Sequence, residues 1–183
     1  KGMLYEGGIR VPYIFRWPGR IPEGSTCDQA ITSVDLYPTL LDVTGAKRPA
    51  GYTLDGVSCL GLLTSGGKER LGREAIYWHF PGYLGAGAGQ WRTLPVSVVR
   101  HGDWKLMEFL EDGRLELYNT REDIGEKNNL ASKMPEKARQ MQEDLHRWRE
   151  AVGARMPGPN TNRVEAPAAP PGKRAARRRS APE

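Results

Sequence analysis

The residues best suited to chemistry stand at the start of the chain, where Lys1 is followed closely by Glu6-Gly7-Gly8. Paired glycines allow backbone conformations that residues with a Cβ resist, so we expect a tight turn there. A lysine ammonium held by such a turn can stabilise an anionic ester oxygen during cleavage. The other interpretation of Lys1 is an ordinary solvated charge.

Three histidines and two cysteines are the remaining candidates, and their spacing does not favour a metal site. Cys27 and Cys59 form no Cys-x-x-Cys pair and have no histidine cluster beside them, so no zinc site is expected. Buried free thiols are one interpretation, and a disulfide in an exported protein is another. His79, in the run YWHFP, is either a strand-end residue or a substrate contact. We expect His101 in a turn and His146 on a solvated helix face.

Composition and charge exclude several classes of protein. The chain has 183 residues, 38% of them hydrophobic, with no run of 18 apolar residues, so no membrane span is expected. It opens on Lys1 without the pattern of a signal peptide. The net charge of +5 lies mostly in residues 172–183, so the rest of the chain is nearly neutral. A specific nucleic-acid binder is therefore not expected, although the basic end could bind polyanions in a salt-sensitive way.

Residues 1–66 have the pattern of an α/β layer. The apolar, aromatic run 11–17 predicts a buried strand. Apolar residues at helical spacing predict a helix that begins near Ser33 or Asp35 and ends at Gly45. A second short helix is predicted over 58–63.

Residues 73–153 predict an antiparallel sheet followed by a long helix. The strand-like runs are 74–80, 96–100, 104–110 and 114–118, and Asp112-Gly113 between the last two indicates a hairpin. Pro135 opens an amphipathic helix that we expect to end at Gly153. Its apolar stripe is expected to pack on the sheet and consists of Ala138, Met141, Leu145, Trp148 and Val152.

Two stretches lack the pattern of a packed element. Residues 82–95, with the sequence GAGAG, predict a mobile loop. Residues 154–183 are rich in Pro, Ala and Arg and predict a disordered basic tail, because they cannot bury enough apolar surface to offset chain entropy. The fold class expected for this chain is α+β.

Several segments, in order, resemble one family. KGMLYEGGIRVPYIFRWPGRI, TSVDLYPTLLDVTG and TLDGVSCLGLL are similar to consecutive segments of type I sulfatases, the formylglycine-dependent, arylsulfatase-like enzymes of the alkaline phosphatase superfamily. YWHFPGY, VVRHGDWKLMEF and DGRLELYNTREDIGEKNNLA are similar to the C-terminal subdomain of bacterial members. The resemblance runs from Lys1 to about Pro159. It implies the end of the catalytic α/β domain in 1–66 and the C-terminal sheet-plus-helix subdomain in 73–153.

The resemblance also implies roles for residues. In sulfatases the lysine of this first segment contacts the sulfate group and helps stabilise the leaving oxygen, which points to Lys1 as a catalytic residue. Glu6, Gly7, Gly8 and Arg10 would shape and anchor the turn. His79 would lie near the mouth of the active site, although similar sulfatases often carry a second histidine just beyond, where this chain has Pro81-Gly82.

Other parts of the sulfatase machinery are not found in this sequence. The formylglycine nucleophile arises from a C/S-x-P/A-S/T-R motif, which neither cysteine fits, and no dense acidic cluster could replace the family's calcium ligands. We therefore expect the C-terminal portion of a sulfate ester hydrolase, inactive alone, with calcium bound by the intact parent and no metal ligand here. The expected substrate is a sulfated small molecule or carbohydrate, and the expected location is periplasmic or extracellular. The alternatives are a non-catalytic carbohydrate-binding or interaction module and a phosphodiesterase or phosphonate hydrolase of the same superfamily.

Overall fold

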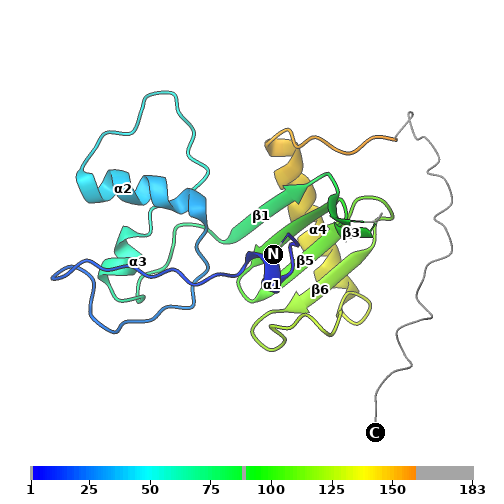
Figure 1. The fold of residues 1–183 in the computed structure, drawn as a ribbon, viewed down its shortest axis with the longest axis horizontal. Coiled ribbons are helices and arrows are strands. Elements are labelled where there is room, and N and C mark those ends of the chain that lie inside the picture. The colour runs from blue at the N-terminus through cyan, green and yellow to red at the C-terminus, as the bar shows by residue number, and fades with distance from the viewer. Residues whose placement is uncertain (1, 88–89, 160–183) are drawn as a thin grey trace, which may run out of the picture.

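The computed structural model describes residues 2–87 and 90–159, which form two adjoining regions (Figure 1). The first contains short helices joined by long extended segments. The second is an antiparallel sheet with a long helix on one face. The expectation of an α+β fold with a small antiparallel sheet and a C-terminal helix is confirmed. The predictions for Lys1 and for most of the basic tail concern residue 1 and residues 160–183, which lie outside the described residues.

The first region carries α1 (Glu6–Ile9), the 3-10 helix η1 (Ser33–Asp35), α2 (Leu36–Thr44) and α3 (Leu60–Thr64). Helix α2 ends at Gly45, whose φ of +67° is the left-handed conformation expected of a glycine at this position. The helices near 36–45 and 58–63 are thus confirmed, with α3 shifted by about two residues.

The prediction of a buried strand over 11–17 is wrong for this chain. The segment is extended but pairs with no strand among residues 2–87 and 90–159, and Ile14 is 91% exposed. A strand needs a neighbour to satisfy its backbone N–H and C=O groups. Apolar composition alone cannot show whether that neighbour lies in the same chain.

The sheet has the order β1-β4-β5-β6 and is antiparallel throughout. Its strands are β1 (Ala75–Phe80), β4 (Val96–His101), β5 (Trp104–Phe109) and β6 (Leu115–Asn119). The β5–β6 hairpin turns through Gly113 at a φ of +69°, so the hairpin predicted from Asp112-Gly113 is confirmed.

Residues 82–95 are not simply a loop. They contribute β2 (Leu84–Gly87) and β3 (Gln90–Thr93), an irregular antiparallel pair interrupted by register shifts. Glycine-rich sequence is a poor guide here, because register shifts tolerate or favour glycine within a strand pair.

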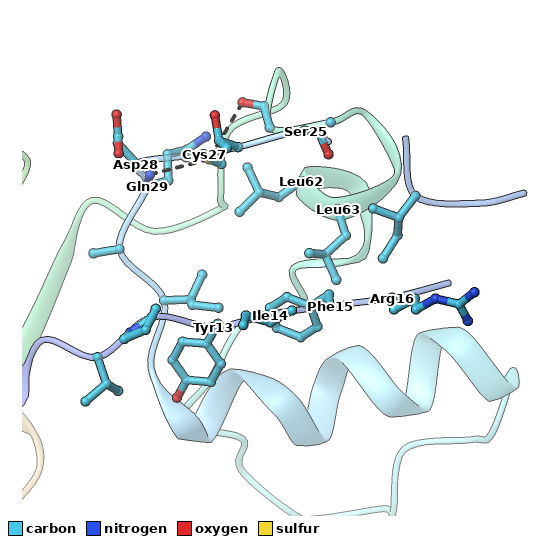
Figure 2. Close-up of a pocket in the computed structure, with 18 of the residues that line it drawn as sticks. Tyr13, Ile14, Phe15, Arg16, Ser25, Cys27, Asp28, Gln29, Leu62 and Leu63 are labelled. Carbon is cyan, nitrogen blue, oxygen red and sulfur yellow. Dashed lines mark hydrogen bonds between the residues drawn. The ribbon is translucent and has the colours of Figure 1, made fainter. Parts of the chain in front are cut away.

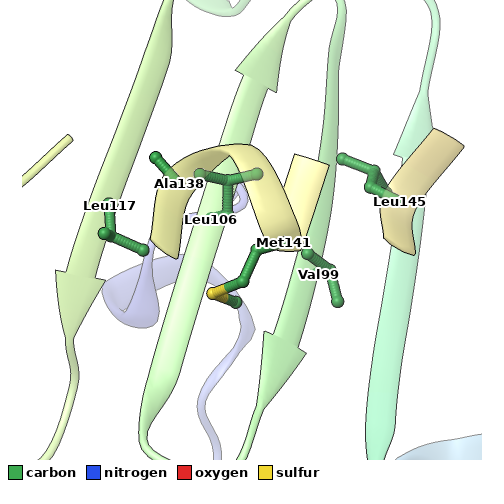
Figure 3. Close-up of a cluster of buried hydrophobic side chains, with 6 residues drawn as sticks. All are labelled: Val99, Leu106, Leu117, Ala138, Met141 and Leu145. Atoms are coloured by element: carbon green, nitrogen blue, oxygen red, sulfur yellow. The ribbon is translucent and has the colours of Figure 1, made fainter. Parts of the chain in front are cut away.

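Helix α4 (Pro135–Ala151) covers one face of the sheet and forms the main core with it (Figure 3). Ala138, Met141 and Leu145 point from the helix toward Val99, Leu106 and Leu117, one from each of β4, β5 and β6. Tyr77 of β1 stacks on Trp148 with 4.9 Å between ring centroids. The predicted amphipathic helix is confirmed, and so are Ala138, Met141, Leu145 and Trp148 of its predicted core stripe. Val152, the last residue of that stripe, follows the helix and is 56% exposed, so the prediction is wrong there.

The opposite face of the sheet carries a second buried cluster. Val96, Val98, Met107, Phe109 and Tyr118 form it, and Leu4 and Tyr5 from the start of the chain pack against it. Because alternate residues of a strand face opposite sides, the four strands serve both clusters. The sheet therefore lies between α4 and the segment that contains α1 (Figure 1). In the described part of the chain, no helix is both long and apolar enough to cross a membrane.

Candidate functional site

The segment that follows Lys1 is held first by the β2–β3 pair, starting at Gly2. The Gly2 carbonyl oxygen accepts a hydrogen bond from the Thr93 hydroxyl at the end of β3. Gly2 has a φ of +83°, and a Cβ at this position would lie 2.6 Å from a methyl carbon of Leu84. Both the conformation and the close packing favour glycine here.

The turn itself is closed by Gly8 rather than by a left-handed glycine pair. Gly7 and Gly8 lie in α1, and a Cβ on Gly8 would come within 2.0 Å of the Met3 carbonyl oxygen. A Cβ on Gly7 would meet nothing within 4 Å. The turn expected at the paired glycines is present. It requires glycine at position 8, because the backbone of Met3 comes too close to leave room for a Cβ there.

Tyr5 anchors the middle of this segment to β6. Its hydroxyl donates to Glu116 Oε2 at 2.6 Å, and Tyr118 donates to the same oxygen at 2.9 Å. Arg114 bonds the other carboxylate oxygen. Burial, followed by the hydrogen bond to Glu116, raises the pKa of both tyrosines above the ordinary value.

Glu6 anchors the segment through charge. Its Oε1 lies 3.1 Å from the Lys105 ammonium in β5, and that ammonium lies 2.7 Å from Glu126 Oε1 in the loop after β6. The Glu6 backbone N–H donates to Glu126 Oε2 at 2.6 Å. Arg10 and Arg100 each approach Glu6 Oε2 at 3.6 Å. Glu6 and Arg10 thus anchor the turn, as expected of them.

His79 lies on the α4 face of the sheet, whereas the segment 2–9 lies against the other face. Its Nδ1 is 2.8 Å from Ser97 Oγ, and its Nε2 is 2.8 Å from the Arg155 carbonyl oxygen after α4. Both ring nitrogens therefore have partners within this chain. The proposed substrate contact of His79 stays a prediction, and His79 and the segment 2–9 are not brought together here.

His146 is not simply solvated, contrary to expectation. Its Nε2 lies 2.9 Å from Glu108 Oε1, and Gln142 and Arg149 from the same helix also bond this carboxylate at 2.8 Å. Burial alone would raise the pKa of Glu108, but the hydrogen bonds from Gln142 and His146 and the charge of Arg149 bring it below the ordinary value. Glu108 and its three partners therefore connect α4 to β5.

The two cysteines are free in the structure, with Cys59 buried and Cys27 exposed. The expectation of buried thiols therefore holds for Cys59 only. Within residues 2–87 and 90–159, no three His, Cys, Asp or Glu side chains come together as a metal site. The residues described thus lack the cluster of carboxylates that a calcium ion would need.

An open groove of about 1740 Å³ runs between the extended segments of the first region and α3 (Figure 2). Phe15 lies across it from Leu62 and Leu63, which point in from α3. Most of the residues that line the groove belong to the stretch 9–33, which contains no strand.

Comparison with known proteins identifies the family. Residues 1–151 match the family described as N-sulphoglucosamine sulphohydrolase, C-terminal. The chain belongs to the sulfatase family, as a C-terminal portion. It is 38% identical over 161 residues to a sulfatase from Formosa agariphila, and 38% identical over 111 residues to human arylsulfatase A. These alignments cover 81% and 61% of this chain.

This sulfatase portion is short beside its relatives, spanning 28% of the Formosa protein and 20% of arylsulfatase A. Among solved structures, a protein in complex with its substrate D-glucosamine-2-N,6-O-disulfate has a TM-score of 0.62 at 26% identity, covering 78% of this chain and 28% of that one. The yidJ protein from Bacteroides fragilis shares the fold, with a TM-score of 0.58 at 19% identity, covering 75% of this chain and 28% of that one.

Sequence reasoning missed Lys105 and Glu126. The indication was present: Lys105 interrupts the apolar run of β5 and is flanked by Trp104 and Leu106. A charge inside a buried strand needs a partner, because leaving it unpaired in the interior is costly. The identity of that partner depends on a contact between residues 99 positions apart, which no local pattern reveals.

Proposed function

We propose that this chain is the C-terminal part of an enzyme that hydrolyses sulfate esters and releases inorganic sulfate. The observation that carries the proposal is the family match over residues 1–151, which includes the segment beginning at Lys1. The described contacts support it, because Gly2 bonds to β3 while Tyr5 and Glu6 hold that segment on β6 and β5 of the four-stranded sheet.

In this proposal Lys1 stabilises negative charge on the sulfate or on the leaving oxygen. An ammonium fixed beforehand near the place where charge develops lowers the barrier more than a mobile one, since no reorganisation is needed during reaction. The role of this chain is then to hold the lysine and to supply part of the wall beside the substrate.

For the substrate class we propose a sulfated carbohydrate. Support comes from the neighbour solved with a glucosamine disulfate and from the N-sulphoglucosamine description of the matching family. Aryl sulfate turnover, as in arylsulfatases, is proposed as a second activity that makes the enzyme easy to assay.

The remaining machinery is proposed to belong to the rest of the sulfatase polypeptide. This includes the formylglycine nucleophile and the calcium site, neither of which the described residues supply. The exposed side chains of Val11, Tyr13 and Ile14 support the proposal, because an extended apolar segment of this kind suits burial within a larger catalytic domain. A periplasmic or extracellular location is proposed from the family resemblance alone.

The test compares the longer parent polypeptide with the isolated 183-residue chain. We expect the parent to release sulfate from 4-nitrophenyl sulfate and from a sulfated glucosamine, and the isolated chain to release none. Cleavage of a phosphate diester or phosphonate in preference to both sulfates would instead assign the parent to another activity of the superfamily. Turnover by the isolated chain would contradict the proposal that the nucleophile and the calcium site lie in the rest of the polypeptide.

A further inference from the structure

Lys105 is a buried lysine whose ammonium lies between two carboxylates from distant parts of the chain. The exposed fraction of its side chain is 0%, and those of Glu6 and Glu126 are 3% and 4%. Removing three charged groups from water carries a large desolvation cost. The close contacts of 3.1 Å and 2.7 Å offset that cost only while all three side chains stay in place.

The backbone around Glu126 is adapted to this contact. Glu126 has a φ of +51°, and no other residue except glycine has a positive φ in the described part of the chain. A left-handed conformation is unfavourable for a residue with a Cβ, because the Cβ comes too close to the following carbonyl oxygen. Its carboxylate offsets this cost by bonding the Glu6 N–H and approaching Lys105.

Glu6 lies in the segment that starts at Lys1, whereas Lys105 and Glu126 belong to the sheet and its following loop. The three charges therefore connect the start of the chain to β5 and to the loop after β6. Gly8, which meets the Met3 carbonyl, makes residues 3–8 a closed unit, so displacing Glu6 displaces the whole turn.

We propose that Lys105 is a positioning residue for sulfate ester cleavage, because it holds the segment 2–9 in the place from which Lys1 reaches the substrate. This inference rests on the proposed function. Lys105 acts through Glu6 and does not itself touch the substrate. Because Lys1 is bonded directly to Gly2, a shift of the segment moves the point from which the lysine side chain starts.

The proposal predicts a kinetic effect that loss of stability alone would not produce. If the segment moves, the leaving oxygen loses its stabilising charge, and esters with poor leaving groups suffer most. Partial unfolding would instead lower the amount of active enzyme and reduce the rates for all esters by the same factor.

The experiment measures kcat and KM of the parent enzyme on 4-nitrophenyl sulfate, a good leaving group, and on phenyl sulfate, a poorer one. We expect Lys105→Met to lower kcat at least about tenfold more for phenyl sulfate than for 4-nitrophenyl sulfate, with KM changing less than kcat. Lys105→Arg, which keeps the charge, should restore part of this difference. Lys127→Met removes an exposed lysine next to Glu126 and should leave both rates unchanged.

Glu126→Gln keeps the inference testable if Lys105→Met fails to fold, since it removes one charge and retains the side-chain size. It should show the same leaving-group dependence, with a smaller loss. Equal losses for both esters in folded variants, or losses below threefold for both, would overturn the inference. Failure of the proposed function looks different, because the unmodified parent would then release no sulfate at all.

Hydrogen exchange on the 183-residue chain tests the same contact without activity. In Lys105→Met, amides of residues 3–10 should exchange at least about tenfold faster, whereas those of α4 should keep their protection. Unchanged exchange in residues 3–10 would show that Lys105 does not hold the segment.

Discussion

Arg73 binds Asp35 with both of its terminal nitrogens, at 2.5 Å and 2.7 Å from the two carboxylate oxygens. Asp35 is fully buried and also accepts hydrogen bonds from the backbone N–H groups of Thr32 and Val57. Arg73 lies just before β1, whereas Asp35 ends η1. This pair therefore fastens the helices of the first region to the chain that enters the sheet.

Loss of Arg73 should destabilise the first region strongly. Arg73→Met leaves Asp35 buried without its cation, and breaking one partner of a buried pair typically costs about 3–5 kcal/mol. Denaturant unfolding of the 183-residue chain measures this loss. Arg139→Met removes an exposed arginine of α4 and should change stability little, because solvent screens its ion pairs with Glu136 and Glu143. Similar losses for both variants would contradict a special role for the buried pair.

The pKa of Glu108, held below its ordinary value in the fold, makes stability depend on pH. A carboxylate with a lowered pKa stabilises the fold above its unfolded pKa of about 4.3, and this stabilisation disappears as pH falls through the folded value. Glu108→Gln should therefore be less stable than the unmodified chain at pH 7, and the difference should shrink below about pH 4. Unfolding at a series of pH values tests this, with Glu150→Gln, an exposed position of α4, as the control. A difference that stays constant from pH 7 to pH 3 would contradict it.

Local pattern was enough to predict the elements that bury their own apolar residues. The stripe of Ala138, Met141 and Leu145 and the Asp112-Gly113 turn both depend on residues close in sequence, and both are found where expected. The prediction of a strand over 11–17 was wrong although its apolar residues are as evident in the sequence as those of α4. A strand needs a neighbouring strand to pair with, and composition does not show whether such a neighbour exists in the chain.

In the candidate site, too, features that depend on neighbouring residues were predicted, and features that depend on distant residues were not. The family resemblance predicts that Glu6, Gly7, Gly8 and Arg10 shape and anchor the turn, because they lie in one continuous segment. A Cβ on Gly7 would meet nothing within 4 Å, so close packing supports this role for Gly8 but not for Gly7. Lys105 and Glu126 were missed, because their role exists only once the sheet brings together residues about 100 positions apart. His146 is expected to face solvent from its helix position, but its ring bonds the Glu108 carboxylate in β5.

Lys1→Ala in the parent enzyme should lower kcat by about 10²–10³-fold, the usual effect of removing one group that stabilises developing charge. The loss should be larger for phenyl sulfate than for 4-nitrophenyl sulfate, and the thermal midpoint should be unchanged. Steady-state kinetics on both esters measures it. A loss below about threefold on both would mean that Lys1 is a surface charge.

The two glycines of α1 provide a matched pair that tests how the turn is closed. Gly8→Ala would place a Cβ within 2.0 Å of the Met3 carbonyl, so the backbone must shift, and we expect destabilisation of more than about 1 kcal/mol. Gly7→Ala meets nothing within 4 Å and reduces the freedom of the unfolded chain, so it should be neutral or stabilising by about 0.4–1 kcal/mol. Thermal unfolding of the 183-residue chain measures both. Equal stability of the two variants would mean that the Met3–Gly8 contact does not close the turn, and the segment carrying Lys1 would then depend on Tyr5 and Glu6 alone.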